Sequence, residues 1–408
     1  MVRIRVIAQI LILFAQASRK FSCRGKMMDR LSLTGKRILV TGAAGFIGAN
    51  LVLRLLKTEK PARVVGIDNL NDYYDVRIKE WRLSQIAVAA SAAKEEGIWR
   101  FVKGDISDAA TVRHLFEEEK PDLVVNLAAQ AGVRFSITNP DAYIQSNIIG
   151  FYNILEACRH SRDTAAKKEG PDSSVIESEP LSDSCGRGVQ HLVYASSSSV
   201  YGTNRKIPFS TDDRVDDPVS LYAATKKSDE LLAHAYAKLY DIPMTGLRYF
   251  TVYGPAGRPD MAYFGFTDKL RSGETIRIFN YGHCRRDFTY IDDIVEGTVR
   301  VMKGAPSRAT GPDGLPVPPY ALYNIGGGEP EDLLDFVDIL QQELRRAGVL
   351  PEDYDCAAHM ELVPMQPGDV PVTYADTAAL ERDFGYRPGT DLRTGLRAFA
   401  EWYRDFYL

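Results

Sequence analysis

The chain has 408 residues, enough for one large α/β domain with an attached lobe or for two domains. Hydrophobic residues make up 45% and charged residues 25% of the sequence, and the formal net charge is −4, so we expect no nucleic-acid partner. The five cysteines are scattered without CxxC spacing, which argues against a disulfide framework or a metal site and favours a reducing compartment.

The N-terminal extension, residues 1–35, precedes the first recognisable motif. Its apolar run at 4–15 is shorter than the roughly 20 residues that a membrane-spanning helix needs. The run is compatible with the apolar part of a signal peptide, or with translation that begins at Met27 or Met28. We expect a cytoplasmic protein, although this run leaves membrane anchoring or export open.

Short apolar runs alternate with longer amphipathic segments through the first half of the chain. The runs have the length and composition of buried strands, and the segments between them have helical periodicity. This alternation predicts an α/β fold, a Rossmann-type doubly wound parallel sheet with helices on both faces. The predicted strands are 37–41, 63–67, 99–102, 123–126 and 191–195, and the predicted helices are 46–57, 76–90, 109–118 and 142–160.

Two segments interrupt the pattern. Residues 161–188 are polar and without periodicity, which predicts a disordered surface insertion. Residues 306–319 are rich in Gly and Pro and are expected to form a loop. From about residue 255 the alternation is lost, which suggests a smaller lobe laid over the sheet. The elements predicted there are strands at 276–279 and 322–325 and helices at 291–302, 333–347 and 391–407.

A glycine-rich run, GAAGFIG at 42–48, lies between the first predicted strand and the first predicted helix. Glycines allow a tight turn and a close approach to a pyrophosphate, whose charge is stabilised at a helix N-terminus. Asp68 ends the second strand, where a carboxylate accepts ribose hydroxyls and repels a 2′-phosphate. A strand–turn–helix without a ligand is the alternative, but strand, glycines, helix and acid in this order favour NAD.

The cofactor-binding prediction also takes in two weaker places, each of which could be a plain turn. Asp105 and Ile106 follow the third strand, and small residues follow the fourth. The predicted NAD-binding domain is therefore 36–254, and 255–408 is expected to be mainly a substrate-binding lobe. The residues expected at the cofactor are Gly42, Gly45, Phe46, Ile47, Gly48, Asp68, Asn69, Asp105, Ile106, Leu127, Ala128 and Ala129, together with Tyr222 and Lys226.

Tyr222 and Lys226 form a YxxxK pair inside a predicted helix at 221–240. Their i, i+4 spacing places the phenol and the ammonium on one helix face. A nearby cation stabilises phenolate, so Tyr222 is a candidate general base or acid for a substrate hydroxyl. YxxxK is common by chance on solvated helices. The serines at 196–199, which end the fifth strand and can relay a proton, favour the catalytic interpretation.

These motifs together resemble the extended short-chain dehydrogenase/reductases over nearly everything from Lys36 to the C-terminus. Within that family the UDP-glucuronate 4-epimerases are the most similar group. Longer runs carry this likeness and are much more specific than the glycine pattern. They are DNLNDYYD at 68–75, QAGVR at 130–134, YASSSSVYG at 194–202, RYFTVYGP at 248–255, and NYG at 280–282 followed by RDFTY at 286–290.

The resemblance implies NAD-dependent epimerisation of UDP-glucuronate to UDP-galacturonate through a transient 4-keto sugar. It implies that Tyr222 takes the proton of the 4-hydroxyl, that Lys226 holds the nicotinamide ribose, and that Ser197 is the catalytic serine. It also implies that Arg286 holds the diphosphate and Asp369 the uridine ribose. No metal is expected.

The sugar carboxylate sets a requirement of its own. A 4-keto-glucuronate is a β-keto acid, so an epimerase has to hold the carboxylate out of alignment with the carbonyl π system to prevent loss of carbon dioxide. By resemblance, Thr251 and Arg258, with Ser198 and Ser199, are in position to do this, and arginine offers a bidentate fork. Otherwise Arg258 would be a solvated loop residue.

Several other functions stay open. A UDP-glucuronate decarboxylase or a nucleotide-sugar 4,6-dehydratase would have an acidic residue in place of Ser199, and a UDP-galactose 4-epimerase usually has Asn in place of Thr251. A UDP-glucose/galactose 4-epimerase, a decarboxylase and, in a different class, a non-catalytic NAD-binding regulatory protein remain the alternatives. The family also implies a homodimer through the helices at 142–160 and 221–240.

Overall fold

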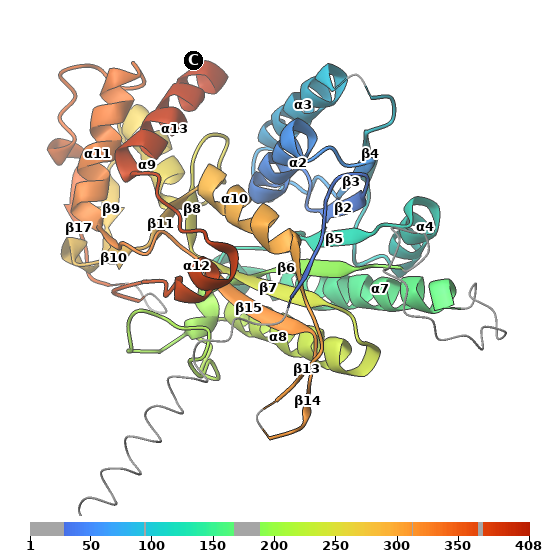
Figure 1. The fold of residues 1–408 in the computed structure, drawn as a ribbon. Helices are drawn as coiled ribbons and strands as arrows, with labels where there is room; N and C mark the ends of the chain where they lie inside the picture. Colours follow the sequence, from blue (N-terminus) through green and yellow to red (C-terminus); the bar gives the residue numbers. More distant parts are fainter. Residues whose placement is uncertain (1–27, 94, 167–187, 312, 366–369) are drawn as a thin grey trace, which may run out of the picture.

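The computed structural model describes residues 28–408, except residues 94, 167–187, 312 and 366–369. A seven-stranded parallel sheet in the order β15-β7-β6-β5-β2-β3-β4 forms its centre (Figure 1). The predicted Rossmann-type fold is thereby confirmed. The strands are β2 (Arg37–Thr41), β3 (Arg63–Asp68), β4 (Trp99–Lys103), β5 (Leu123–Asn126), β6 (His191–Ser197), β7 (Met244–Tyr249) and β15 (Tyr320–Ile325).

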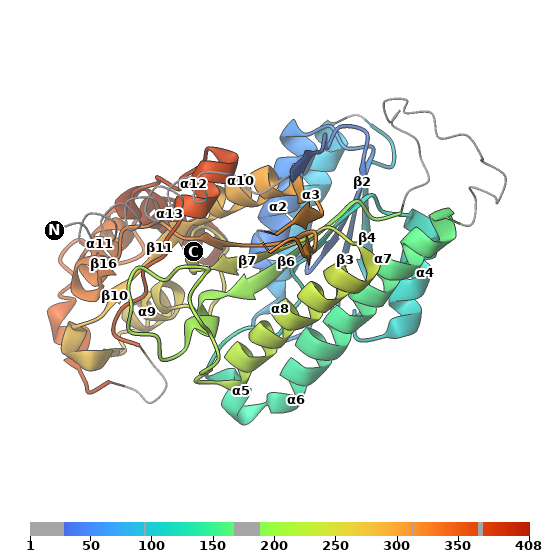
Figure 2. The same ribbon diagram turned by 60° about the horizontal axis from the view of Figure 1, so that its bottom comes forward.

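Helices cover both faces of the sheet, because each strand is apolar on both sides. One face carries α2 (Phe46–Thr58), α3 (Val76–Ala92) and α10 (Ile291–Met302), which share one hydrophobic cluster with the sheet. The other face carries α4 (Ala109–Glu119), α7 (Gly150–Ala166) and α8 (Leu221–Tyr240), which lie side by side (Figure 2). The sequence order of the strands reverses between β2 and β5, and ligands of such sheets bind at the carboxyl ends there.

The segment predicted as one helix at 142–160 is built differently. It begins as α6 (Pro140–Tyr143), which follows α5 (Phe135–Thr138), continues as a π-helix over Ile144–Ile149, and only then becomes α7. Because α7 runs to Ala166, a disordered insertion that starts at residue 161 was wrong for its first six residues. Residues 167–187 of the predicted insertion lie outside the described part of the chain.

A smaller lobe from the C-terminal part of the chain stands beside the sheet and has a hydrophobic core of its own (Figure 1). It is joined to the sheet by the parallel pair β8 (Thr251–Tyr253) and β11 (Phe288–Tyr290). The C-terminal part also contributes β15 and α10 to the sheet domain. The lobe contains α9 (Ala262–Arg271), β9 (Ile276–Ile278), β10 (Arg285–Arg286), β16 (Glu331–Asp332), α11 (Leu333–Arg346), β17 (Met360–Leu362) and α13 (Leu392–Tyr407).

The remaining elements are divided between the sheet domain and the lobe. The loop predicted at 306–319 was wrong in part, since Ala309–Thr310 and Pro316–Val317 pair as the antiparallel strands β13 and β14. The short elements are β1 (Met28–Arg30), β12 (Gly304–Pro306) and α12 (Ala378–Phe384), with 3₁₀ turns at Ser198–Tyr201, Phe279–Gly282 and Ala357–His359.

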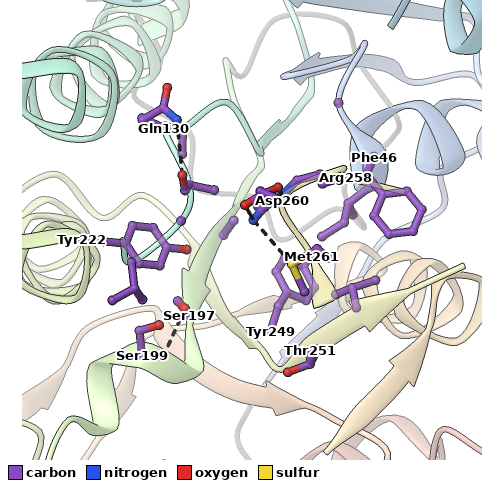
Figure 3. A pocket seen from close by; sticks show the side chains of 18 of the residues that line it. Phe46, Gln130, Ser197, Ser199, Tyr222, Tyr249, Thr251, Arg258, Asp260 and Met261 are labelled. Atoms are coloured by element: carbon purple, nitrogen blue, oxygen red, sulfur yellow. Dashed lines mark hydrogen bonds and ion pairs between the residues drawn. The ribbon is translucent and has the colours of Figure 1, made fainter. Parts of the chain in front are cut away.

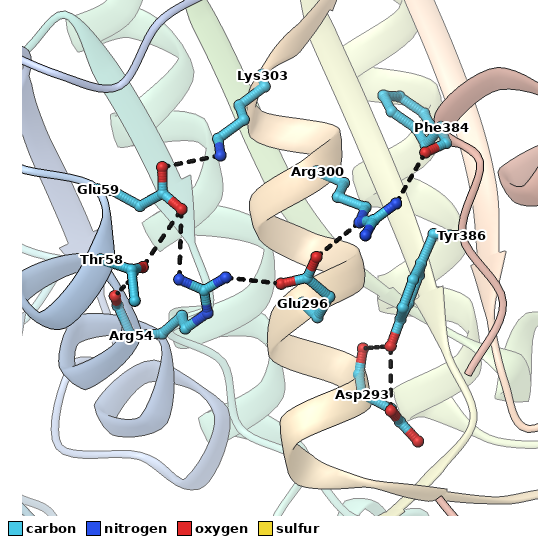
Figure 4. Close-up of polar contacts among 9 residues, drawn as sticks. All are labelled: Arg54, Thr58, Glu59, Asp293, Glu296, Arg300, Lys303, Phe384 and Tyr386. Carbon is cyan, nitrogen blue, oxygen red and sulfur yellow. Dashed lines mark hydrogen bonds and ion pairs between the residues drawn. The ribbon is translucent and has the colours of Figure 1, made fainter. Parts of the chain in front are cut away.

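A seam of ion pairs connects α10 to α2 (Figure 4). Arg54 donates to Glu296 at 2.8 Å, and Glu296 also accepts from Arg300 at 2.6 Å. Lys303 lies 2.8 Å from Glu59. Single exposed ion pairs contribute little to stability, but this network joins an N-terminal helix to one from the C-terminal part. It therefore supports the apolar contact that makes the two parts one domain.

Three further findings concern the described residues only. None of their helices combines the length and the hydropathy needed to cross a membrane, and the apolar run at 4–15 is outside them. Cys158, Cys284 and Cys356 are buried free thiols. No group of three or more His, Cys, Asp or Glu side chains in this part of the chain is arranged to hold a metal ion.

Gly66 on β3 provides a test of the packing that holds Asp68 at the sheet edge. A Cβ atom at Gly66 would lie 2.4 Å from the Trp99 ring and 2.5 Å from the Cβ of Ala43. We expect Gly66→Ala to lower the free energy of unfolding by about 1–3 kcal/mol through overpacking, as measured by urea denaturation. Gly389→Ala is the matched control, because a Cβ there meets no atom within 4 Å. Equal stabilities of the two variants would contradict this account.

Candidate functional site

A cavity of about 720 Å³ lies at the carboxyl edge of the sheet, between the sheet and the lobe. Every predicted site residue that the structure describes lines it, and Asp369 lies outside the described residues. Residues more than 240 positions apart in the sequence therefore face one space. The predicted residues on its walls are Gly42, Gly45, Phe46, Ile47, Gly48, Asp68, Asn69, Asp105, Ile106, Leu127, Ala128, Ala129, Ser197, Ser198, Ser199, Tyr222, Lys226, Thr251, Arg258 and Arg286.

The glycine turn leaves no room for side chains. Gly42 has a φ of +68°, and a Cβ on it would lie 2.8 Å from the backbone nitrogen of Ala128. A Cβ on Gly48 would lie 2.1 Å from the carbonyl oxygen of Gly42. Gly45 is the N-cap of α2 and offers no side-chain cap, so the first N–H groups of the helix are left for an anion. The turn fits the pyrophosphate of a dinucleotide.

Asp68 is fixed at the end of β3 by two backbone hydrogen bonds. One carboxylate oxygen accepts from the Ala44 N–H at 3.1 Å and the other from the Leu70 N–H at 2.9 Å. A carboxylate oxygen accepts more than one hydrogen bond, so both oxygens retain capacity for the hydroxyls of a ribose. This arrangement suits NAD, whose adenosine ribose carries a free 2′-hydroxyl where NADP has a 2′-phosphate.

Lys79 is a cavity-lining residue that the sequence reasoning missed. Its ammonium donates to the carbonyl oxygen and to the side-chain oxygen of Asn71, both at 2.7 Å, and burial lowers its pKa. No motif marks this residue. The loop that follows Asp68 brings Asn71 to it, and that contact is set by tertiary structure.

Asp105 and Asn69 form the next part of the wall. The Asn69 amide donates to Asp105 at 2.8 Å, and the N–H of Ser107 donates to the other carboxylate oxygen, also at 2.8 Å. Burial alone would raise the pKa of Asp105, but the hydrogen bonds from Asn69 and Ser107 outweigh it and lower the pKa. The carboxylate is therefore held ionised as an acceptor.

Tyr222 on α8 and Ser197 at the end of β6 both line the pocket (Figure 3). The Ser197 oxygen accepts from the Ser199 N–H at 3.1 Å, which leaves its hydroxyl proton available to a ligand. The Tyr222 ring packs edge-to-face on Tyr143 with centroids 6.0 Å apart. Tyr143 is itself held by hydrogen bonds to the carbonyl oxygens of Ala131 and Gly132, so this contact orients the Tyr222 phenol.

Two acceptors of the protein fix the position of the Lys226 ammonium. Its ammonium donates to the Ala195 carbonyl oxygen at 3.0 Å and to Asp229 at 3.1 Å. Asp229 was not predicted as part of the site. Nor was Asn147 of the π-helix, which accepts from the Gln130 N–H at 2.8 Å and donates to the Thr225 hydroxyl at 3.0 Å. Asn147 thus ties the loop after β5 to the helix of Tyr222 and Lys226.

Arg258 already has a partner on the opposite wall (Figure 3). Its Nε and Nη2 lie 3.0 and 2.8 Å from the two carboxylate oxygens of Asp260, which also accepts from the Tyr73 hydroxyl at 3.3 Å. A ligand carboxylate would have to share the guanidinium with Asp260 or displace it. Thr251 faces the same space, as do Ser198 and Ser199.

Arg286 lies at the lobe end of the cavity. Its guanidinium donates to the carbonyl oxygens of Arg285 and Pro371 at 3.2 and 3.1 Å. The neighbouring Asp287 is buried and accepts from the backbone N–H groups of Gly327 and Ala375 at 2.5 and 2.9 Å. Burial raises the pKa of Asp287 to about 6. Together these contacts tie the segment of Arg286 and Asp287 to two other segments of the chain, one at Gly327 and one at 371–375.

Comparisons with known proteins agree with this architecture. The sequence matches the NAD dependent epimerase/dehydratase family over residues 38–326. It is 41% identical over 378 residues to UDP-glucuronate 4-epimerase 2 of Arabidopsis thaliana, which covers 91% of this chain and 77% of that protein. It is 40% identical over 380 residues to a probable UDP-glucuronate 4-epimerase of Rhizobium meliloti, which covers 91% of this chain and 98% of that protein.

A solved structure gives the same result. The crystal structure of UDP-glucuronic acid 4-epimerase from Bacillus cereus, in complex with UDP-glucuronic acid and NAD, matches with a TM-score of 0.71 and 30% sequence identity. The match covers 91% of this chain and all of that one. The chain therefore belongs to the NAD-dependent epimerase/dehydratase family, as its resemblance to the extended short-chain dehydrogenase/reductases predicted.

Proposed function

We propose that the protein binds NAD and interconverts UDP-glucuronate and UDP-galacturonate by epimerisation at C4. One observation carries the proposal: a single cavity joins the glycine turn and Asp68 to Tyr222, Ser197 and Arg258. The names and the bound ligands of similar proteins support it. We take the cytoplasm as the compartment, since the reaction needs NAD and a nucleotide sugar.

The side chains of this protein would move protons and hold the sugar. NAD, when bound, supplies the acceptor for the C4 hydride and afterwards its donor. Tyr222 takes the proton of the 4-hydroxyl, and Ser197 hydrogen-bonds the same oxygen and relays the proton. Lys226 favours the phenolate and holds the nicotinamide ribose. After the 4-keto sugar turns over in the cavity, Tyr222 returns the proton on the other face.

A set of cavity-lining side chains from several elements would hold the substrate carboxylate. Ser198, Ser199 and Thr251 offer hydroxyls, and Arg258 offers a charged fork. Holding the carboxylate there keeps the β-keto acid from losing carbon dioxide. At the other end of the cavity, Arg286 would hold the diphosphate, and Asp369, outside the described residues, would hold the uridine ribose.

A neutral UDP-hexose is the second candidate substrate. The Asp260 carboxylate already balances the charge of Arg258, so the site does not require an anionic sugar to satisfy this arginine. A 4-epimerase for UDP-glucose and UDP-galactose would use the same Tyr222, Ser197 and Lys226.

Product analysis tests the proposal directly. Incubation of the purified protein with UDP-glucuronate and NAD should yield UDP-galacturonate, identified by NMR of the sugar ring protons. UDP-glucose in a parallel reaction should react at least about tenfold more slowly, since it lacks the charged contact to Arg258. A UDP-pentose with carbon dioxide would make the enzyme a decarboxylase, and conversion of UDP-glucose alone would make it a neutral-sugar epimerase.

The phenol of Tyr222 can be removed alone. Tyr222→Phe should reduce turnover by about 10²-fold or more, because the proton acceptor is lost, while NAD stays bound as judged by its absorbance after gel filtration. Tyr240→Phe, at the exposed end of the same helix, is the control and should keep full activity. Full activity of Tyr222→Phe would exclude this tyrosine as the base.

We also propose that two copies pair through the face formed by the π-helix, α7 and α8. Large apolar side chains are exposed there, in contrast to the buried faces of the same helices: Ile144, Ile149, Tyr152, Leu231 and Leu239. α8 contacts both the π-helix and α7, so these side chains extend over adjacent elements. An exposed apolar patch of this kind is typical of a subunit interface.

Sedimentation velocity tests the pairing. The wild type should sediment as a dimer, and Leu231→Glu, which places a charge in the patch, should shift the population to monomer. Leu315→Glu is the control, since Leu315 is equally exposed (63% against 61% for Leu231) but lies next to the hairpin strand β14 (Figure 1). A monomeric wild type, or a dimer that Leu231→Glu leaves intact, would contradict the proposal.

A further inference from the structure

Asp229 is a buried carboxylate that the proposed mechanism does not use. It follows Tyr222 by seven residues and Lys226 by three on α8, so all three lie on one helix face. Its side chain is only 3% exposed, and that of Lys226 only 4%. One carboxylate oxygen lies 3.1 Å from the Lys226 ammonium, and the other is buried without a hydrogen-bond partner among the described residues.

Lys226 has its three N–H donors divided between the protein and the cavity. An ammonium donates three hydrogen bonds, and Ala195 and Asp229 accept two of them. Lys226 lines the cavity, whereas Asp229 does not. The carboxylate therefore holds the ammonium from the side away from the ligand, which leaves one donor for the cavity.

Glu230, the other buried carboxylate near Asp229, has hydrogen-bond and ion-pair partners of its own. Glu230, the next residue on α8, accepts from Ser196 on β6 at 2.7 Å and from two nitrogens of Arg248 on β7, at 2.7 and 2.9 Å. The hydroxyls of Tyr194 on β6 and Tyr320 on β15 bond to each other at 2.8 Å. Within the described part of the chain, Lys226 is thus the cation that balances Asp229.

We propose that Asp229 is a positioning residue that holds the Lys226 ammonium toward the cofactor and offsets part of its charge at Tyr222. The proposal rests on the assignment of Tyr222 as the proton acceptor. Lys226 favours the phenolate, and a carboxylate beside Lys226 weakens that effect. The readiness of Tyr222 to ionise is then set by the pair of Lys226 and Asp229.

The ionisation of Asp229 determines the pH range in which this residue changes the ionisation of Tyr222. Burial raises the pKa of Asp229 to about 7, although the Lys226 ammonium favours the ionised form, and Glu230 adds to the rise. Above that pH the carboxylate is charged and offsets Lys226; below it the carboxyl group is neutral. Variants that lack the carboxylate should therefore differ from the wild type mainly on the alkaline side of pH 7.

The test follows phenolate absorbance in the near ultraviolet on the protein with bound NAD. The contribution of Tyr222 is obtained by subtracting the titration of the matching Tyr222→Phe protein. In Asp229→Asn the ionisation midpoint of Tyr222 should fall by roughly 0.5 to 1 pH unit, the size of an interaction over two helical turns at intermediate dielectric. The acid limb of kcat should move the same way, with KM nearly unchanged.

Two further variants isolate the role of Lys226. In a Lys226→Met background, Asp229 has no cation and should stay protonated, so adding Asp229→Asn should leave the Tyr222 midpoint where it is. Asp241→Asn, the same substitution at the exposed C-cap of α8, should titrate like the wild type. If Asp229→Asn does not fold, Asp229→Ser removes the same charge and is measured instead.

An unchanged or raised Tyr222 midpoint in Asp229→Asn would overturn the proposal. A shift that persists with methionine at position 226 would overturn the route through Lys226. The phenol titration requires no sugar substrate. If the wild type fails to convert UDP-glucuronate, the proposed reaction is wrong, and the titration still decides the role of Asp229.

Discussion

The contact between the glycine turn and the end of β5 is the constraint on which the site depends. Gly42 faces the backbone of Leu127 and Ala128 so closely that a Cβ atom would lie within 3 Å of both. The Thr41 hydroxyl donates to Asn126 at 2.7 Å and accepts from the Ala128 N–H at 3.1 Å. This crossing aims the first turn of α2 at the cavity and starts the loop that carries Gln130. From Gln130, Asn147 continues the connection to α8.

Buried charge along α8 is the second organising feature. Glu230 with Arg248, and Asp229 with Lys226, are ion pairs with side chains at most 4% exposed. Removing such charges from water costs several kcal/mol per ion, and a buried pair is often no more stabilising than apolar residues of the same size. Their value to the protein lies in placement. Glu230 joins α8 to Arg248 on β7 and to Ser196 on β6. Lys226 joins α8 to the Ala195 carbonyl oxygen on β6, and these contacts set where Tyr222 and Lys226 meet the cavity.

The opposite wall is organised by Asp260. This carboxylate is bound by Arg258 and by Tyr73, and Tyr73 belongs to the loop that follows Asp68. A change in the loop that follows Asp68 would therefore alter the position of Arg258, the residue proposed to hold the sugar carboxylate. Asp260 also gives Arg258 a partner while the sugar turns. An epimerase has to release and rebind its sugar in each cycle, and an arginine with an internal partner is never left unpaired in the process.

Local sequence patterns were sufficient for the fold and for many of the residues that line the cavity. Strand–helix alternation predicted the parallel sheet, the glycines at 42, 45 and 48 predicted the dinucleotide turn, and YxxxK spacing predicted that Tyr222 and Lys226 share a face. Periodicity, turn geometry and i, i+4 spacing involve residues only a few positions apart, so they can be recognised from the amino-acid sequence. The longer runs of family resemblance then indicated Ser197, Thr251, Arg258 and Arg286.

Other features were decided only by the folded chain. The π-helix at Ile144–Ile149 interrupts a segment with ordinary helical periodicity, and its Asn147 bonds to residues on two other elements. β15 joins the sheet from beyond the predicted domain boundary. Lys79 lies on α3 and meets the loop residue Asn71 only in the folded chain. Asp260 lies in a loop, and Asp229 matters because the fold buries it next to Lys226. The sequence by itself determined where the main helices, strands and turns form and which side chains share a face of one element. Tertiary structure alone decided which charges would be buried and which distant residues would meet, as Glu230 meets Arg248, because no local rule relates residues on separate elements.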